Sequence, residues 1–296
     1  MSMVSTASAR ATAQDLVAAD QVTPQALHGA FAASFADYLA GPFELPLAQW
    51  DSFVARQAAD LALSRVALRD GGIVALALVA PRPARRCWRV ATMGATPAAR
   101  GTGLAPALLD DLLARAAAAG MDAVELEVFA ANTRAVRLYE GRGFQAVDEL
   151  HGHSLDAGTP RDSCRAVHDA HALAVPRDDA LAWLDDAAPT TPPLPLQVTA
   201  QVLARLVTPW RAWRLGDAQL VAGGDERLLR VHSFVHSPGA EADADALLAS
   251  LRAGAPDARL EVPPLQRQAV GGAALDRAGA MRQPLHQLWM RCALAG

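Results

Sequence analysis

A glycine-rich turn is the first stretch of this sequence whose residue types suggest chemistry. Its residues are Arg100, Gly101, Thr102, Gly103, Leu104 and Ala105. Glycine lets a chain turn sharply and brings its backbone close to a ligand. Leucine and alanine recur every four positions after the turn, which predicts a helix, and the start of a helix offers unpaired N–H groups and a partial positive charge. We therefore expect a phosphate or diphosphate site; the alternative is a strand-to-helix connection whose glycines serve only the turn.

The composition narrows the range of partners. The chain has 296 residues, a formal net charge of -4 and a pI near 6.1. Nucleic-acid binders normally carry a basic patch, so this balance favours a small molecule or a protein as partner, with no nucleic acid and no anionic membrane. Cys87, Cys164 and Cys292 form neither a C-x-x-C pair nor a disulfide framework, which indicates a reducing, cytoplasmic setting. No apolar run approaches the roughly 20 residues of a membrane span.

The elements that must position the turn follow from the hydrophobic pattern. Residues 23–60 are expected to form a helix, a loop and a second helix. The predicted strands are residues 61–68, 73–80, 87–95, 124–129 and 144–150. Gly94 lies late in the third of these, where a glycine often marks a bulge or the approach of a ligand. The strand, helix and strand around the turn predict a right-handed crossover between parallel or nearly parallel strands.

Two motifs in this order resemble those of the GNAT superfamily of acyl-CoA-dependent N-acyltransferases. The glycine turn fits the Q/R-x-x-G-x-G/A signature, and Asn132 to Phe144, NTRAVRLYEGRGF, is similar to the N-x-x-A-x-x-x-Y-x-x-x-G-F segment. The resemblance covers roughly residues 15–155. It implies an α/β (α+β) fold with a mixed, mostly antiparallel sheet, a central splayed pair of parallel strands, and helices on its flanks.

The resemblance also implies acetyl-CoA as cosubstrate and no metal. The amides of the glycine turn would hold the diphosphate of coenzyme A. Met93, Gly94 and Ala95 would pair with the pantetheine arm and donate to the thioester oxygen, which would stabilise developing negative charge. Asn132 would contact the arm near the thiol, and a plain helix cap is the alternative for its side chain.

Catalytic residues are carried over in the same way. Tyr139 matches the tyrosine that protonates the departing thiolate as general acid; the alternative is an aromatic residue on the buried face of a short helix. Glu127 resembles the glutamate of the L-E-V segment in members that acetylate ribosomal-protein N-termini, and would accept the proton of the amine. Strand alternation places Glu125 on the same face, so either carboxylate could serve, and both could instead be solvated at the end of the sheet.

Other charged residues are weaker candidates for binding the acceptor or a metal. Asp37, Glu44 and Asp51 lie in the region that forms the acceptor side in the superfamily and could bind a cationic acceptor, although each also reads as a solvated surface charge. The histidine pairs whose spacing could share a metal are His151 with His153, His168 with His171, and His232 with His236. None has a nearby cysteine or a convincing third ligand, so we predict no metal site. The first pair is expected to lie nearer the acceptor.

The second half of the chain loosely repeats the first. We expect a GNAT-like catalytic domain over residues 1–155, a connecting segment with a proline-rich linker over 156–195, and a degenerate GNAT-like domain over 196–296. Leu275 takes the place of Tyr139, so the acid is missing. Gln268 to Ala273 satisfies the Q/R-x-x-G-x-A pattern but lies too close to Gly279 to open a long helix, and we attribute the match to chance. An unrelated α+β module is the alternative.

These residues together predict transfer of an acetyl group from acetyl-CoA to a primary amine by direct attack in a ternary complex. One alternative is a GNAT-like module that binds acyl-CoA and regulates a partner without catalysis. Another is a nucleotide-binding protein that uses the same turn. No motif specifies the acceptor, which is a small molecule or a peptide amine, and the sequence is compatible with a homodimer.

Overall fold

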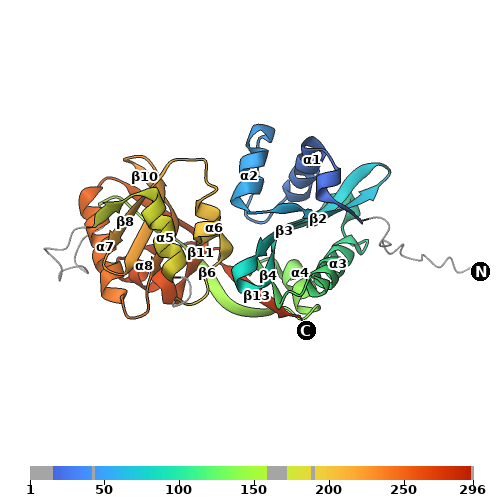
Figure 1. Cartoon of the computed structure of the whole chain (residues 1–296). Coiled ribbons are helices and arrows are strands. Elements are labelled where there is room, and N and C mark those ends of the chain that lie inside the picture. The colour runs from blue at the N-terminus through green and yellow to red at the C-terminus, as the bar shows by residue number, and fades with distance from the viewer. Residues whose placement is uncertain (1–15, 42–43, 159–171, 188–190, 295–296) are drawn as a thin grey trace, which may run out of the picture. The chain divides into compact units, whose positions relative to one another are not determined.

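The computed structural model describes residues 16–41, 44–158, 172–187 and 191–294 (Figure 1). Contacts divide the chain into two compact units, and neither is one continuous stretch. The first unit comprises Met1–Leu126, Asn132–Gln145 and Met290–Gly296, and the second comprises Glu127–Ala131 and Ala146–Trp289. Each unit therefore contains a segment from the opposite half of the chain. The domain boundaries expected at residues 155 and 195 stay predictions.

The sheet of the first unit runs in the order β1-β2-β3-β4-β5. Its strands are β1 (Leu16–Ala18), β2 (Asp60–Arg69), β3 (Gly72–Arg82), β4 (Cys87–Ala95) and β5 (Ala123–Phe129), of which the part up to Leu126 belongs to this unit. Neighbouring strands are antiparallel except β4 and β5, which are parallel. A parallel pair needs a long crossover connection, and the helix that follows the glycine turn supplies it.

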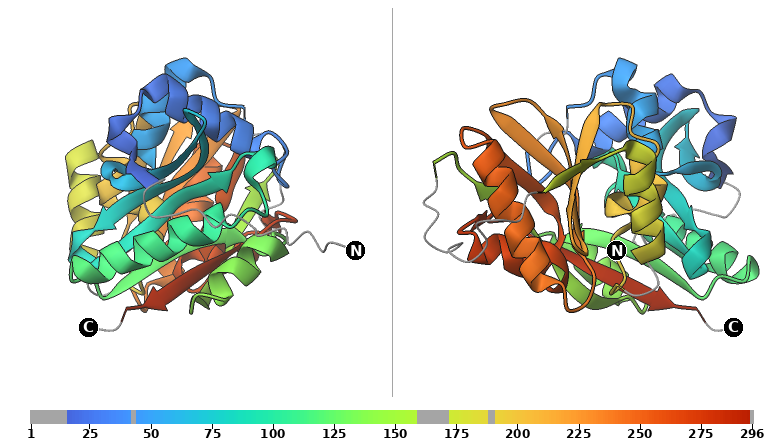
Figure 2. Two further views of the ribbon diagram at one scale, coloured as in Figure 1. Left: turned by 90° about the vertical axis from the view of Figure 1, so that its right-hand side faces the viewer. Right: turned by 60° about the vertical axis from the view of Figure 1, so that its left-hand side comes forward.

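Helices cover both faces of this sheet (Figure 2). They are α1 (Pro24–Phe35), α2 (Trp50–Arg56), α3 (Leu104–Ala118) and the short α4 (Thr133–Glu140). Leu76 and Leu78 of β3 pack with α1 and α2 on one face, whereas Ala75 and Ala77 pack with the start of α3 on the other. Successive side chains of a strand point to opposite faces, so a continuous apolar strand such as β3 can be buried on both.

The strands of the second unit follow the order β6-β11-β10-β9-β8-β7, with β12 beside β6. Its strands are β6 (Gln145–Leu155), β7 (Leu173–Val175), β8 (Trp210–Leu215), β9 (Ala218–Gly224), β10 (Leu228–His236), β11 (Arg259–Arg267) and β12 (Met281–Arg282). Its helices are α5 (Arg177–Ala187), α6 (Ala200–Leu203), α7 (Glu241–Gly254) and α8 (Ala273–Arg277). The parallel pair here is β10 with β11, and α7 is the crossover between them.

One order of elements occurs twice. The first half runs β1-α1-α2-β2-β3-β4-α3-β5-α4-β6, and the second runs β7-α5-α6-β8-β9-β10-α7-β11-α8 and ends in β12 and β13 (Gln287–Ala293). Nearly all of β6 belongs to the second unit, whereas the end of β13 belongs to the first, where Leu294 N donates to Asp122 O over 3.0 Å. The fold is therefore a tandem mixed α/β repeat whose halves exchange their last strands.

The described part of the chain includes no helix with both the length and the apolar character of a membrane span.

Candidate active site

The glycine turn joins β4 to α3, as the sequence predicts. Gly101 and Gly103 have φ values of +77° and +88°, in the left-handed region that favours glycine. No described atom lies within 4 Å of the position that a Cβ would take on either residue. The Thr102 hydroxyl donates to the Ala99 carbonyl over 2.6 Å and fixes the turn from within. The turn is thus fixed by an internal hydrogen bond, while the space beside Gly101 and Gly103 stays open.

The start of α3 has no side-chain cap among the described residues. Gly103 is its N-cap residue, and the first turn contains no acidic side chain. The helical bonding begins with Ala107 N, which donates to Gly103 O over 3.1 Å, and Pro106 has no N–H to satisfy. The amides of Leu104 and Ala105 consequently have no helical acceptor. Unpaired amides at the positive end of a helix of 15 residues suit a diphosphate.

The Arg100 side chain does not extend toward the open edge of the turn. Its Nη1 and Nη2 donate to the two carboxylate oxygens of Asp37 over 2.5 and 2.6 Å. Nη2 also donates to Ser34 O over 3.1 Å, and Nε donates to Ala95 O over 3.3 Å. Asp37 is therefore a surface carboxylate, as the sequence suggests, but one that is paired with Arg100; a role in binding a cationic acceptor stays a prediction. Its hydrogen bonds with Arg100 lower the pKa of its carboxyl group.

The strands next to the turn are splayed. β4 and β5 pair only over Cys87–Val90 and Ala123–Leu126. Along β3, Leu78 pairs with Thr92 and Val79 pairs with Val90, so a bulge places Ala91 as the extra residue of β4. The expectation that Gly94 marks a bulge is wrong, because Gly94 pairs in register with Leu76.

Close packing explains the glycine at position 94. A Cβ there would stand 3.0 Å from the Ser34 Cβ and 3.1 Å from the Phe35 ring. Real Cβ atoms rarely approach other atoms so closely, so any side chain at this position would displace the end of α1 from β4. Gly94 thus lets helix and strand meet.

The direction of the β4 backbone separates Met93 and Ala95 from Gly94. Just beyond β4, Thr96 N donates to Val74 O over 2.9 Å. Bonded and non-bonded pairs alternate along an antiparallel ladder, so Gly94 turns its N–H and C=O toward β3. Met93 and Ala95 turn theirs the other way, toward the side from which β5 diverges. On this side lie both backbone groups of Met93 and those of Ala95, whose C=O already accepts a hydrogen bond from Arg100 Nε. The backbone of Met93 and the N–H of Ala95 can therefore pair with an extended ligand.

The second motif forms α4. Asn132 is its N-cap, and the side-chain oxygen accepts a hydrogen bond from Ala135 N over 3.2 Å. Tyr139 lies near the end of the helix with 7% of its surface exposed, and its ring is 5.7 Å from the ring of Phe144. Burial raises the pKa of the Tyr139 phenol well above its ordinary value, and neighbouring Tyr38 raises it further. The phenol is therefore protonated, as a general acid requires.

Tyr38 is a neighbour of Tyr139 that the sequence did not assign to the site. It follows Asp37 at the end of α1, and its ring lies edge-on to Phe35 with 5.2 Å between centroids. Burial raises the pKa of its phenol as well. The sequence offers one signal, since Tyr38 and Tyr139 are the 2 tyrosines of the chain.

Glu125 is an internal ion-pairing residue. Its side chain is fully buried and pairs with Arg82 over 2.8 Å and with Arg85 over 3.0 Å. Arg291, from the end of β13, lies 3.7 Å away. Arg82 is buried as well, whereas the side chains of Arg85 and Arg291 are 29% and 38% exposed. Glu125 is therefore not a solvated carboxylate, and its role as the alternative base stays a prediction.

Glu127, two residues along β5, is assigned to the second unit. It is partly buried, and its Oε2 accepts a hydrogen bond from Gln197 Nε2 over 3.2 Å. The other predicted site residues, in the glycine turn, β4 and α4, all belong to the first unit. Glu127 is thus the predicted site residue that the second half of the chain contacts directly.

The remaining candidates are dispersed. Glu44 and Asp51 are exposed. His151 stacks on His286 with 5.3 Å between centroids, and His153 is buried 3.2 Å from Asp276. His168 and His171 lie outside the described residues. Across the described chain, no three His, Cys, Asp or Glu side chains are grouped so that they could hold a metal ion.

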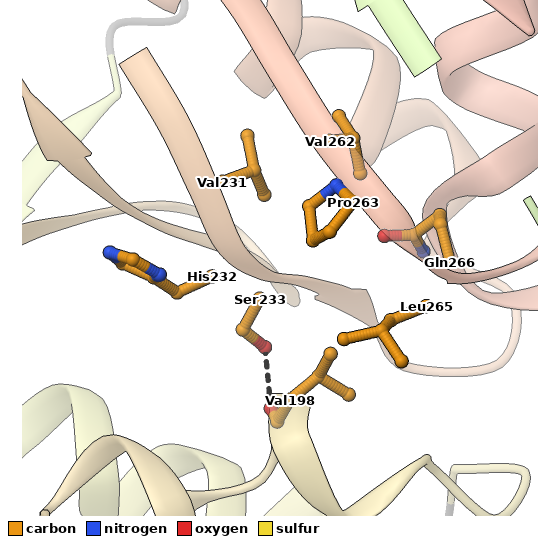
Figure 3. A pocket seen from close by; sticks show the side chains of 8 residues that line it. All are labelled: Val198, Val231, His232, Ser233, Val262, Pro263, Leu265 and Gln266. Atoms are coloured by element: carbon orange, nitrogen blue, oxygen red, sulfur yellow. Dashed lines mark hydrogen bonds between the residues drawn. The ribbon is translucent and has the colours of Figure 1, made fainter. Parts of the chain in front are cut away.

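The second unit has a corresponding crossover with different chemistry. β10 pairs with β11 only over Leu228–Arg230, and a bulge follows near His232. Beyond the paired part lies a small pocket (Figure 3), lined by Val198, Val231, His232, Ser233, Val262, Pro263, Leu265 and Gln266. Ser233 Oγ donates to Val198 O over 2.8 Å, as Figure 3 shows, and Gln266 Nε2 donates to Phe234 O over 3.1 Å. Much of the pocket's polar chemistry is thus satisfied within the protein.

The start of α7 likewise differs from that of α3. Its first turn contains Glu241 and Asp243. Their negative charges interact favourably with the positive end of the helix and would repel a bound anion. Gln268–Gly272, the second match to the glycine signature, leads only to the 5 residues of α8. Leu275, in the place of Tyr139, is fully buried.

Comparison with known proteins assigns one segment of the chain to a family. Residues 26–144, which include the turn, the splayed strands and Tyr139, match the family model described as Acetyltransferase (GNAT) family. This segment is a GNAT acetyltransferase domain. No curated protein sequence matches the chain.

Solved structures extend the GNAT fold to the whole chain. A GCN5-related N-acetyltransferase from Sphaerobacter thermophilus aligns with a TM-score of 0.62 and 16% identity, over 97% of this chain and 98% of that one. A protein from Pyrococcus horikoshii gives a TM-score of 0.65 at 12% identity, over 96% and 92%. A tandem GNAT protein from the clavulanic acid biosynthesis pathway gives 0.57 at 15%, over 95% and 98%. The chain therefore has a tandem GNAT fold, and its second unit has Leu275 in the place of Tyr139 and no matching glycine turn before α7.

Proposed function

We propose that this protein is an N-acetyltransferase that moves an acetyl group from acetyl-CoA to a primary amine by direct attack in a ternary complex. The observation that carries the proposal is the uncapped, acid-free start of α3 behind two left-handed glycines. It supports a diphosphate at the turn, and the divergence of β5 from β4 after Val90 supports an extended arm beside it.

Backbone groups position the donor in this proposal. The amides of Gly101, Gly103, Leu104 and Ala105 hold the diphosphate, because Arg100 N and Thr102 N donate to Pro97 O and Ala99 O within the turn. Met93 and Ala95 pair with the pantetheine arm. An N–H of one of these two residues donates to the thioester oxygen, on which negative charge develops during attack. Asn132 uses its oxygen for the helix cap, so its amide nitrogen serves as the donor to the arm.

Two side chains move the protons. Tyr139 gives its proton to the departing thiolate, and its raised pKa keeps that proton in place until it is needed. Glu127 accepts the proton that the attacking amine loses, directly or through water, and the hydrogen bond from Gln197 fixes one of its oxygens. The net charge of -4 supports a small-molecule or peptide amine as acceptor, and the buried free cysteines Cys87 and Cys292 support a cytoplasmic setting.

Turnover of acetyl-CoA across a panel of amines tests the proposal. The panel contains peptide N-termini, lysine peptides, polyamines, amino acids and aminoglycosides, and free thiol is the readout. Amine-dependent thiol release is expected. Tight coenzyme A binding without release would instead indicate a non-catalytic acyl-CoA-binding module. Equal thermal stabilisation by ADP, ATP and coenzyme A would indicate a nucleotide-binding protein.

A further inference from the structure

Arg100 connects three elements of the first unit. Four hydrogen bonds leave its guanidinium group: two to the Asp37 carboxylate, one to Ser34 O at the end of α1, and one to Ala95 O at the end of β4. A guanidinium group has five N–H donors, so most of its capacity is used here. The paired geometry on Asp37 fixes the direction of the side chain as well as its position. The first residue of the glycine turn is therefore fastened to the end of α1.

The end of α1 is in turn fastened to β4. Ser34 and Phe35 stand 3.0 and 3.1 Å from where a Cβ on Gly94 would lie, so no free space separates helix and strand. Met93 and Ala95, on either side of Gly94, are the residues whose backbone groups face away from β3. A displacement of the α1 end would consequently be transmitted to them.

The same segment is followed closely by Tyr38. Its ring lies 5.2 Å from the ring of Phe35, and its phenol contributes to the raised pKa of Tyr139. Residues 34–37 thus contact the glycine turn and β4.

We propose that Asp37 is a positioning residue that acts through Arg100 and couples occupation of the glycine turn to the end of α1. This inference rests on the proposed function, because it assumes that the turn binds coenzyme A. When the turn is occupied, the Arg100–Asp37 pair holds the α1 end, and with it the β4 backbone and Tyr38, in the arrangement needed for transfer. Asp37 touches neither substrate in this account.

Hydrogen–deuterium exchange with and without coenzyme A tests the coupling. In the wild-type protein, coenzyme A should slow exchange over residues 100–107 and also over residues 30–38. In Asp37→Asn, slowing should persist over 100–107 and be lost over 30–38. With an amine that the wild type acetylates, kcat should fall about five- to tenfold while the dissociation constant of coenzyme A changes less than twofold. Asp37→Glu, which keeps a carboxylate, should restore most of both effects.

The matched control is Asp122→Asn. Asp122 pairs with Arg86 just before the opposite end of β4, and its side chain is 54% exposed, against 58% for Asp37. Equal effects of the two Asn variants would overturn the coupling, as would unchanged protection of residues 30–38 in Asp37→Asn. If residues 30–38 of Asp37→Asn already exchange faster than in the wild type without coenzyme A, Asp37 only stabilises the end of α1. That result would also overturn the coupling. Coenzyme A binding without transfer would reject only the proposed activity, and no binding at all would reject both.

Discussion

The two halves of the chain build the same crossover and differ in how its helix begins. In the first half, β4 leads through the glycine turn to an α3 start without carboxylates. In the second half, β10 leads to an α7 start that contains Glu241 and Asp243, and Asp243 accepts a hydrogen bond from Asp217 N over 2.9 Å. A carboxylate at a helix start occupies the electrostatic position that a phosphate would take. The comparison shows that the two halves share the scaffold of the fold and differ in the charge at the start of the crossover helix.

The two parallel strand pairs differ in a second way. Each places an arginine opposite a glutamate, Arg89 opposite Glu125 and Arg230 opposite Glu261. Glu125 is fully buried among other arginines, whereas the Glu261 side chain is 35% exposed and lies 3.7 Å from Arg230. The glutamate at the same position of the parallel pair is therefore part of a buried ion-pair cluster in the first unit and of a surface ion pair in the second.

Replacing the proposed acid gives the largest expected effect. Tyr139→Phe should lower kcat by about 10²- to 10⁴-fold, because it removes the proton donor to the thiolate. The second half has Leu275 in this place, so the variant should retain no activity from a second site. Acetyl-CoA turnover by the variant and by the wild type measures this.

The pH profile sharpens the same prediction. Burial raises the pKa of Tyr139, so ionisation of this acid should not lower the wild-type kcat below about pH 10, where an ordinary tyrosine titrates. A Tyr139→Phe variant that matches the wild type throughout this pH range would contradict the acid assignment and the contrast with Leu275.

Replacing each of these two glutamates by glutamine compares the contributions of the buried cluster and the surface pair to stability. Glu125→Gln should cost about 3 kcal/mol or more of unfolding free energy, since it leaves the buried Arg82 without its counter-charge. Glu261→Gln should cost less than about 1 kcal/mol, as is usual for an exposed pair. Urea unfolding followed by circular dichroism gives both values. Equal losses would show that burial of Glu125 does not distinguish the two positions.

A carboxylate introduced at the glycine turn should make the start of α3 resemble that of α7. Gly103→Asp should weaken coenzyme A binding about fivefold more than Gly103→Asn does, because the added charge repels the diphosphate. The Asn variant carries the same backbone strain at a φ of +88° without the charge. Calorimetric titration with coenzyme A compares them, and equal affinities would argue against a diphosphate at this turn.

Acid stability gives the smallest expected difference and concerns the second unit. A hydrogen bond from Arg282, supported by Gln268, lowers the pKa of Asp276 to about 2. Because this pKa is lowered in the folded state, the carboxylate stabilises the fold above about pH 4, and the contribution is lost as the pH falls toward 2. Asp276→Asn should therefore flatten the fall of Tm over this range, modestly because the side chain is 32% exposed.

The control for this effect lies in the first unit. Asp110→Asn breaks an exposed pair with Arg142, 2.6 Å apart, and should leave the shape of the Tm profile unchanged. If Tm falls with pH equally in the wild type and in Asp276→Asn, the Asp276 carboxylate does not contribute to acid stability.

Local patterns were sufficient to predict much of the fold and part of the site. The four-residue repeat after Gly103 predicted α3, and the glycines predicted a turn that only residues with accessible left-handed φ form easily. The bulge was misplaced, because Gly94 is required by the packing of Phe35 and not by the geometry of its own strand. Nothing in the sequence near Arg100 points to Asp37, 63 positions away.

What the sequence determined by itself is therefore local: the periodicity of each element, the conformational freedom of Gly101 and Gly103, and the absence of acidic residues where α3 begins. Only the tertiary structure decided which charges are neutralised, as Glu125 is by Arg82 and Arg85, and which unit receives the last strand of each half. The physical reason is that periodicity and backbone torsion depend on neighbouring residues. Burial and ion pairing depend on segments that meet only when the chain has folded.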